Sequence, residues 1–359
     1  MKILFCCGKR RPHIGNALQI NERFLNKRFK ILLNYVLGPA LFIVLGFVIY
    51  LKVKHQPDLP GKLSLLKNTF SNGGIWQAAL LVLLAGANWG IEARKWQLLM
   101  RPVERVSFLT SVKAVLSGLA LSLFLPNGLG EYPARALYMQ EGNRLRSVAL
   151  NIAGSMSQLI VTLVAGIGSL IYLRNYSWGT SPEMQGISVL WVDGVISMIA
   201  MGTVLLIFTY FRLSWLTMLF EKIPFVFRYK YFIEQLETFH WKELTRILNL
   251  SCIRFVIFIV QYVLVLHVLR VEIDFADAVC TTCVLFLLLA ILPTIPFADV
   301  GIRGEAGRQL FGLLTADVFG VIVTTSVIWF VNLIIPSIEG SLFLLGIKIF
   351  KKQEKSTSA

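Results

Sequence analysis

Long stretches without a charged side chain dominate this chain. Residues 31–51, 68–91, 147–173, 278–298 and 318–338 contain no Asp, Glu, Lys or Arg. Each stretch is long enough for the roughly 20 apolar residues that a membrane-spanning helix requires. None of them alternates polar and apolar residues at period two, as the strands of a membrane barrel do. The pattern therefore predicts an all-α, polytopic membrane helix bundle of about seven to eight spans.

Composition and charge agree with a membrane protein. Hydrophobic residues make up 56% of the chain and charged residues 15%, whereas soluble domains carry about 25% charged residues. No soluble domain is predicted to carry the net charge of +15, so we expect contact with anionic lipid and no binding of nucleic acid. No motif with the spacing of a metal, nucleotide or dinucleotide site is present, so we expect no cofactor, no metal and no catalytic residue.

The chain divides into a short basic start, a membrane domain and a short tail. Residues 1–30 form a basic leader with a single acidic residue, which predicts a cytoplasmic N-terminus. Residues 31–350 form the membrane domain, in which residues 31–51 are the first span, and residues 351–359 are the tail. Residues 212–246 mix charged and aromatic side chains and are predicted to form an amphipathic cytoplasmic connector on the membrane surface. We expect an integral protein of the plasma (inner) membrane.

Two parts of the membrane domain follow the same order. Residues 68–212 and 247–350 each contain a span, an apolar run, a motif rich in proline and glycine, and further apolar sequence, which in the second part reads as a hairpin broken at Pro336. This order predicts two inverted structural repeats, each with a broken or re-entrant helix pair. If both motif regions return to the side from which they enter, each part crosses three times and the C-terminus lies outside. The lysine-rich tail favours the cytoplasm instead, so both arrangements fit the sequence.

The two motifs share their chemistry. Residues 126–135 read PNGLGEYPAR, and residues 296–308 read PFADVGIRGEAGR. Each opens with proline at the end of an apolar run and presents a Gly-Glu pair, followed by an arginine about one helical turn later. Because broken backbone and charge are both costly in a membrane, their double occurrence favours a functional role. Each motif predicts a helix that ends in a loop and a short second helix, and Pro133 fits the first turn of such a helix beginning just after Gly130.

We expect the second helix of each motif to bind an anion. Free N–H groups at its start and arginine side chains nearby both suit a phosphate. The alternative is that these charges are interfacial loop residues that pair with one another. The residues predicted to bind a lipid headgroup are Glu131, Arg135, Arg303, Glu305, Arg308, Asn127, Gly130 and Asp299.

Other charged residues lie within or beside apolar stretches. Arg254 and Glu339 are predicted to line a polar cavity, because a charge buried in a membrane costs about 2.5–3.5 kcal/mol even on the most permissive scale. Residues 92–96, EARKW, are instead typical of an interfacial anchor at the end of a span.

Through these motifs, the chain resembles the transmembrane region of lysylphosphatidylglycerol synthases, a flippase-like membrane family. The resemblance covers most of residues 31–350 and is carried by residues 92–96, by Pro-x-x-x-Gly-Glu-x-x-x-Arg at 126–135 and by Gly-x-Arg-x-Glu at 301–305. It implies movement of a lipid with a charged headgroup between leaflets, or service to a lipid-modifying enzyme. The recurrent polar positions that it implies are Glu131, Arg135, Arg303 and Glu305.

The chain also departs from that family. Residues 154–158 read GSMSQ where a charged pattern is expected, and residues 298–300 read ADV where glycines are usual. No synthase domain follows the membrane domain, so transfer of an aminoacyl group is not expected.

The leading hypothesis is a lipid translocator that moves an anionic phospholipid or a polyprenyl-phosphate lipid through a polar groove between the two halves. The alternative is a membrane scaffold that does not transport and that presents lipid to a glycosyltransferase or another lipid-modifying enzyme, which residues 212–246 motivate. An intramembrane transferase using Glu131 or Glu305 as a base is a third hypothesis.

Overall fold

The computed structural model describes residue 64 and residues 75–123, 128–177, 189–211, 241–292 and 299–345. The leader at 1–30, the predicted first span, Asn127 and the tail lie outside these residues, as does most of the connector. For Asp299 the backbone alone is described.

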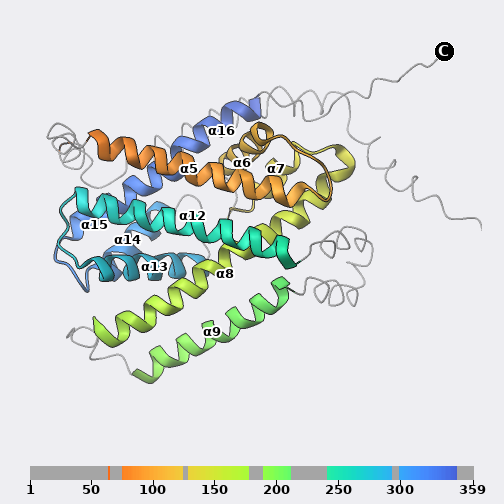
Figure 1. Ribbon diagram of the computed structural model, residues 1–359. Coiled ribbons are helices and arrows are strands. Elements are labelled where there is room, and N and C mark those ends of the chain that lie inside the picture. The colour runs from red at the N-terminus through yellow and green to blue at the C-terminus, as the bar shows by residue number, and fades with distance from the viewer. Residues whose placement is uncertain are drawn as a thin grey trace, which may run out of the picture.

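The regular secondary structure in this part of the chain is helical throughout, which confirms the predicted all-α class (Figure 1). Four long helices are α5 (Ile75–Met100), α8 (Arg144–Tyr176), α9 (Val189–Phe211) and α12 (Trp241–Val268). Shorter ones are α6 (Phe108–Ser122), α7 (Glu131–Ala136), α13 (Phe275–Ile291) and α14 (Asp299–Phe311), with a 3-10 turn, η3, at Glu141–Asn143. The last helical segment comprises α15 (Val318–Trp329), the π-helical turn η8 (Phe330–Ile334) and α16 (Ile335–Leu345). Within the described residues, 5 helices are long and apolar enough to cross a membrane.

Side-chain caps fix where several of these helices begin. The first N–H groups of a helix have no intrahelical partner, and Ser or Asp just before the helix can accept from them. Ser107 accepts from the backbone N–H of Thr110 at 3.2 Å at the start of α6. Asp274 accepts from Ala276 at 3.0 Å at the start of α13. These two caps place the starts of α6 and α13 at the polar residues that precede each apolar run.

Helices α5 and α12 lie side by side and antiparallel in the centre of the bundle (Figure 1). The Gln261 side chain donates to the Leu81 carbonyl near one end of this contact at 3.3 Å. Near the other end, Lys95 donates to the hydroxyl of Ser251 at 3.4 Å. These helices are the first of the described helices in the two predicted halves.

Each short apolar helix packs against a helix of the other half. Helix α6 runs along α16, where the Ser117 hydroxyl donates to the Gly340 carbonyl at 3.4 Å. A Cβ atom at Gly340 would lie 1.9 Å from the carbonyl oxygen of Leu116, so only glycine permits this approach. Helix α13 runs along α8, where Ser177 donates to Asp277 at 2.6 Å. The halves are therefore interlocked rather than merely adjacent.

The two short-helix pairs enter the bundle from opposite ends. Glu104, after α5, accepts from the backbone of Gln140 and the side chain of Asn143 at 3.2 Å, so α6 and α7 leave from and return to one end. Val271, after α12, lies against Gly320 at the start of α15, so α13 and α14 return to the opposite end. At 15 and 17 residues, α6 and α13 are shorter than the roughly 20 residues of a spanning helix. This geometry is re-entrant, while the repeat itself stays a prediction.

The charges of the described loops differ between the ends. We call the end at which α5 finishes the basic end, and the opposite one the acidic end. Basic residues at the first are Arg101, Arg105, Arg144, Arg146, Lys242 and Arg246, which outnumber the acidic residues Glu104, Glu141 and Glu243 there. Acidic residues at the second are Glu272, Asp274, Asp277 and Asp317, which outnumber the basic residues Arg174 and Arg270 there.

The expected hairpin at Pro336 is wrong, because the helix continues through this residue to Leu345. Proline lacks an N–H, and its ring clashes with the preceding turn of an α-helix. The wide turn η8, in which the Ile335 N–H bonds the Phe330 carbonyl, precedes Pro336 and makes room for that ring. The second half therefore has one long helical segment fewer than expected. Because α16 is antiparallel to α6, with Phe343 beneath Lys113, it ends toward the basic end, which agrees with the charge of the lysine-rich tail.

Among the described residues, the two largest hydrophobic clusters include side chains from opposite ends of α5 and α12. The first is built around Trp96 and Leu150, and the second around Tyr262, Leu285 and Phe311. Charged and amide side chains of α5 and α12 meet between these clusters.

Candidate functional site

A buried ion cluster is centred on Glu92, whose side chain contacts three cations. Its Oε2 lies 2.7 Å from the Lys95 ammonium and 2.9 Å from the Arg254 guanidinium. Its Oε1 lies 3.0 Å from Arg135, which in turn contacts Glu131 at 2.6 Å. Ion pairs thus connect helix α5 to both α7 and α12. Three cations face two carboxylates, so the cluster carries a net positive charge.

Neutral polar side chains extend this cluster on both sides. The Arg254 Nε donates to Asn88 at 2.9 Å, and Asn88 donates to Asn332 in η8 at 3.4 Å. On the other side, the Lys95 ammonium donates to Ser251, whose hydroxyl lies 2.8 Å from that of Ser157 in α8. A continuous chain of polar contacts therefore connects both halves inside the bundle.

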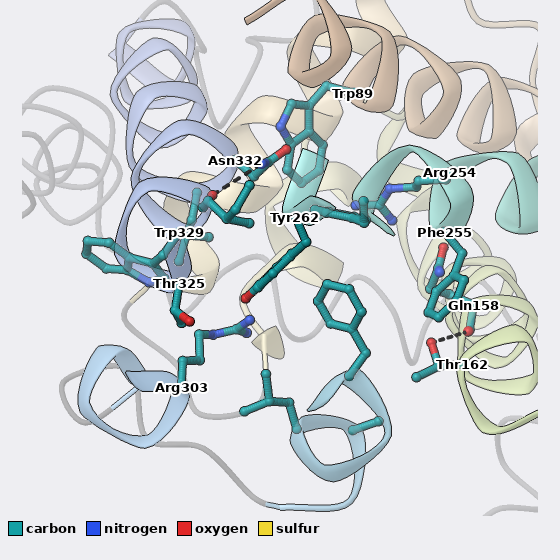
Figure 2. Close-up of a pocket in the computed structure, with 16 residues that line it drawn as sticks. Trp89, Gln158, Thr162, Arg254, Phe255, Tyr262, Arg303, Thr325, Trp329 and Asn332 are labelled. Atoms are coloured by element: carbon teal, nitrogen blue, oxygen red, sulfur yellow. Dashed lines mark hydrogen bonds between the residues drawn. The ribbon is translucent and has the colours of Figure 1, made fainter. Parts of the chain in front are cut away.

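A cavity of about 310 Å³ lies beside this cluster (Figure 2). Its walls come from α5 and α8 of the first half and from α12 through η8 of the second. Of the 16 lining residues, the two charged ones are Arg254 and Arg303. Figure 2 shows Arg303 extending from α14 toward Tyr262 and Thr325, while Arg254 borders the cavity from α12.

Aromatic side chains hold Arg254 at the cavity wall. Its guanidinium carbon lies 4.9 Å from the ring centre of Trp89 and 5.6 Å from that of Phe258. Cations over aromatic faces are attracted to them, most strongly where water is excluded. The aromatic residues that line the cavity are Trp89, Phe255, Phe258, Tyr262, Phe286 and Trp329. The site therefore combines an apolar wall with two planar cations, a combination suited to a phosphate ester or a carboxylate.

In the described part of the first motif, Gly130 and Arg135 are buried, and none of its residues lines this cavity. Helix α7 begins at Glu131, directly after Gly130, as the sequence predicts. A Cβ atom at Gly130 would lie 2.2 Å from the Leu121 carbonyl oxygen, so α6 covers the start of α7. Arg135 donates to Glu92 and Glu131. In this structure, Arg135 joins α7 to α5 through Glu92.

The second motif divides its charges between two faces of α14. Arg303 lines the cavity, whereas Glu305 and Arg308 are exposed and pair with each other at 2.6 and 2.9 Å. Glu339, predicted to line a cavity, lies exposed on α16 and outside the lining residues.

The interpretation of residues 92–96 as an interfacial anchor is wrong. Helix α5 continues to Met100, and Glu92, Lys95 and Trp96 are 4%, 2% and 0% exposed. A sequence signal was present, because Asn88, Glu92 and Lys95 recur at helical spacing on one face. Hydropathy alone conceals this signal, because charged residues that follow an apolar run are also typical of the end of a span.

Comparison with known proteins assigns the chain to a family. A search of curated proteins finds no match. The family described as the lysylphosphatidylglycerol synthase TM region matches residues 35–340, which is most of the chain and includes the cluster, the cavity and both motifs. Together with the five apolar helices of spanning length, this match shows an integral membrane protein. The chain belongs to the family of the lysylphosphatidylglycerol synthase transmembrane region.

Proposed function

We propose that this protein moves a lipid with an anionic headgroup, an anionic phospholipid or a polyprenyl phosphate, between the two leaflets. The observation that carries the proposal is the charge of the cavity, whose charged lining residues are both arginines. A charge inside a membrane is costly and is retained mainly where it serves a ligand or an ion path. Two arginines in an aromatic wall favour an anion over a cationic or zwitterionic headgroup.

The depth of the cavity supports movement rather than surface binding. Arg254 lies close to the middle of α12, which spans Trp241–Val268. A headgroup held there would be far from both membrane surfaces, since each residue of a helix adds about 1.5 Å. A lipid bound at this depth is partway across.

The size of the cavity limits what enters it. Ligand pockets usually enclose about 300–1,000 Å³. A cavity of about 310 Å³ suits a headgroup and leaves the hydrocarbon chains of the lipid in the bilayer.

The architecture offers a route for access from both sides. Re-entrant pairs from opposite ends approach the centre of the bundle, an arrangement common in transporters that bind substrate at the midplane. By the positive-inside rule, the proposal places the basic end, and with it the N-terminus, in the cytoplasm of a plasma (inner) membrane.

The test is lipid exchange in proteoliposomes. Fluorescent phosphatidylglycerol or polyprenyl phosphate in the inner leaflet becomes accessible to dithionite when it is moved outward. Wild-type protein should accelerate exchange of at least one of these lipids over that of fluorescent phosphatidylcholine. Arg254→Gln and Arg303→Gln should each lower the rate roughly tenfold, since a charge-assisted hydrogen bond contributes about 1.5–3 kcal/mol.

A matched control lies on the same helix. Arg246 is exposed at the basic end of α12, so Arg246→Gln should leave exchange unchanged. The proposal is overturned if wild-type protein accelerates exchange of neither anionic lipid. Lipid that co-purifies without exchange would then favour the scaffold that presents lipid to a modifying enzyme.

A further inference from the structure

We propose that Glu92 is an internal anion that competes with the headgroup phosphate for Arg254. When the headgroup enters, the Arg254 guanidinium exchanges one carboxylate contact for the phosphate, and it returns to Glu92 when the headgroup leaves. This inference rests on the proposed function of the cavity as an anion site, and it assigns Glu92 the role of a positioning residue that sets affinity.

The distribution of charge makes Arg254 the exchangeable member of the cluster. Lys95 contacts one oxygen of Glu92 and Arg135 contacts the other, so Glu92 keeps two cations without Arg254. Arg254 and Lys95 contact the same carboxylate oxygen of Glu92, Oε2. Because the cluster has more cations than carboxylates, one positive charge lacks a carboxylate of its own.

Exposure identifies the same residue. The Arg254 side chain is 13% exposed, whereas those of Lys95 and Arg135 are 3% and 6% exposed. Arg254 is also the member of the cluster that lines the cavity. An anion in the cavity therefore meets Arg254 and does not reach Lys95 or Arg135.

Other contacts allow the exchange without moving the whole side chain. The guanidinium rests against Trp89 and Phe258, and its Nε donates to Asn88. The contact with Glu92 uses Nη1 alone. The guanidinium is planar and rigid, so turning it about the carbon bonds of the side chain redirects Nη1 and Nε together while the rings keep the cation at the wall. Glu92 is not left unpaired, which would be the costly outcome for a buried carboxylate.

Competition of this kind suits transport, because a carrier has to release what it binds. Phosphate binding at Arg254 alone would be strengthened by the low dielectric of the site. The need to displace Glu92 lowers the net affinity, since a ligand gains only the difference between its own contact and the one it replaces. Removing the internal anion should therefore strengthen binding and slow release.

The decisive variant is the double substitution Glu92→Gln with Lys95→Met. It removes one cation and one carboxylate, so the net charge of the cluster is unchanged. The probe is dihexanoylphosphatidic acid, and binding is read from the change in tryptophan fluorescence, because Trp89 and Trp329, two of the 8 tryptophans, lie in the cavity wall. We expect the double variant to bind the probe about tenfold more tightly than wild type and to exchange fluorescent lipid more slowly. Adding Arg254→Gln to the double variant should abolish the gain in affinity.

The outcomes separate this inference from the proposed function. If wild-type protein binds the probe no better than dihexanoylphosphatidylcholine and moves no anionic lipid, the proposed function itself fails. If wild type binds and moves lipid but the double variant binds the probe equally or more weakly, Glu92 merely holds Arg254 in place and the competition is refuted. Should the double variant not fold, Glu92→Asp, which withdraws the carboxylate by one methylene and keeps all charges, should still tighten binding, and unchanged or weaker binding would refute the inference.

Discussion

Removing the carboxylate of Glu92 alone should destabilise the protein strongly. In Glu92→Gln, the buried cations Lys95, Arg135 and Arg254 lose the acceptor that all three share, and Glu131 remains for Arg135 only. Breaking a buried ion pair by removing one partner costs about 3–5 kcal/mol, because the remaining charge stays buried without compensation. The polarity of the new amide recovers part of this, so we expect a loss at the lower end of that range.

The assay is thermal unfolding of detergent-purified protein, followed by fluorescence-detected gel filtration. A loss of about 3 kcal/mol corresponds to a fall in Tm of roughly 5–10 °C for a domain of moderate size. Adding Lys95→Met should restore most of the Tm, since it removes the cation that depends most on Glu92. Glu305→Gln is the matched control, because Glu305 pairs with Arg308 at the same spacing but on an exposed face, where such pairs contribute little.

Unfolding of Glu92→Gln at the wild-type temperature would show that these ion pairs do not stabilise the fold. If Lys95→Met lowers the Tm of the single variant further, the cluster is held by packing and not by charge balance.

Three further predictions concern the fold and the cavity. Gly340→Ala should lower the Tm and slow lipid exchange, because the new Cβ would meet a backbone carbonyl of α6 and overpacking costs about 1–3 kcal/mol. The control Gly202→Ala places its Cβ in open space on α9 and should unfold like wild type. Arg303→Glu should abolish exchange of anionic lipid in proteoliposomes while the protein still elutes as a folded species, and sustained exchange would contradict the position of the cavity on the path. A cysteine at Arg101 and a cysteine at Glu141, introduced singly, should react with a membrane-impermeant maleimide from the same side, because α6 and α7 return to the end from which they enter; labelling from opposite sides would show that this region crosses.

The helical architecture could be predicted because membrane burial leaves a strong local signal. Apolar runs without charge set the positions of α8, α13 and α15, and proline and glycine marked the breaks between the paired short helices. The start of α7 at Glu131 followed from Gly130 and from the place of Pro133 in the first turn. Each of these inferences needed only neighbouring residues.

The ion cluster could not be predicted in the same way, because its contacts are long-range. Glu92 and Arg254 are separated by 162 positions, and Glu92 and Arg135 by 43. Hydropathy alone ends a span at the first group of charges, so Glu92 and Lys95 were placed at the interface. The hairpin expected at Pro336 was wrong for a related reason, since the turn η8 that accommodates this proline depends on packing and leaves no local sequence pattern.

The unequal use of the two motifs follows from where each arginine stands on its helix. In the first motif, Glu131 and Arg135 are four residues apart, so they share a face of α7, and that face is turned toward Glu92. In the second, Arg303 precedes Glu305, and Arg308 follows it by three residues. At 3.6 residues per turn, Arg303 and Arg308 lie about 140° apart around α14. One of them can therefore face the cavity only if the other turns away, and the structure places Arg303 in the wall and Arg308 on the exposed face with Glu305. The first motif secures the anion that holds Arg254, and the second supplies the other cation of the cavity, so a substitution in either motif should affect the same lipid through different residues.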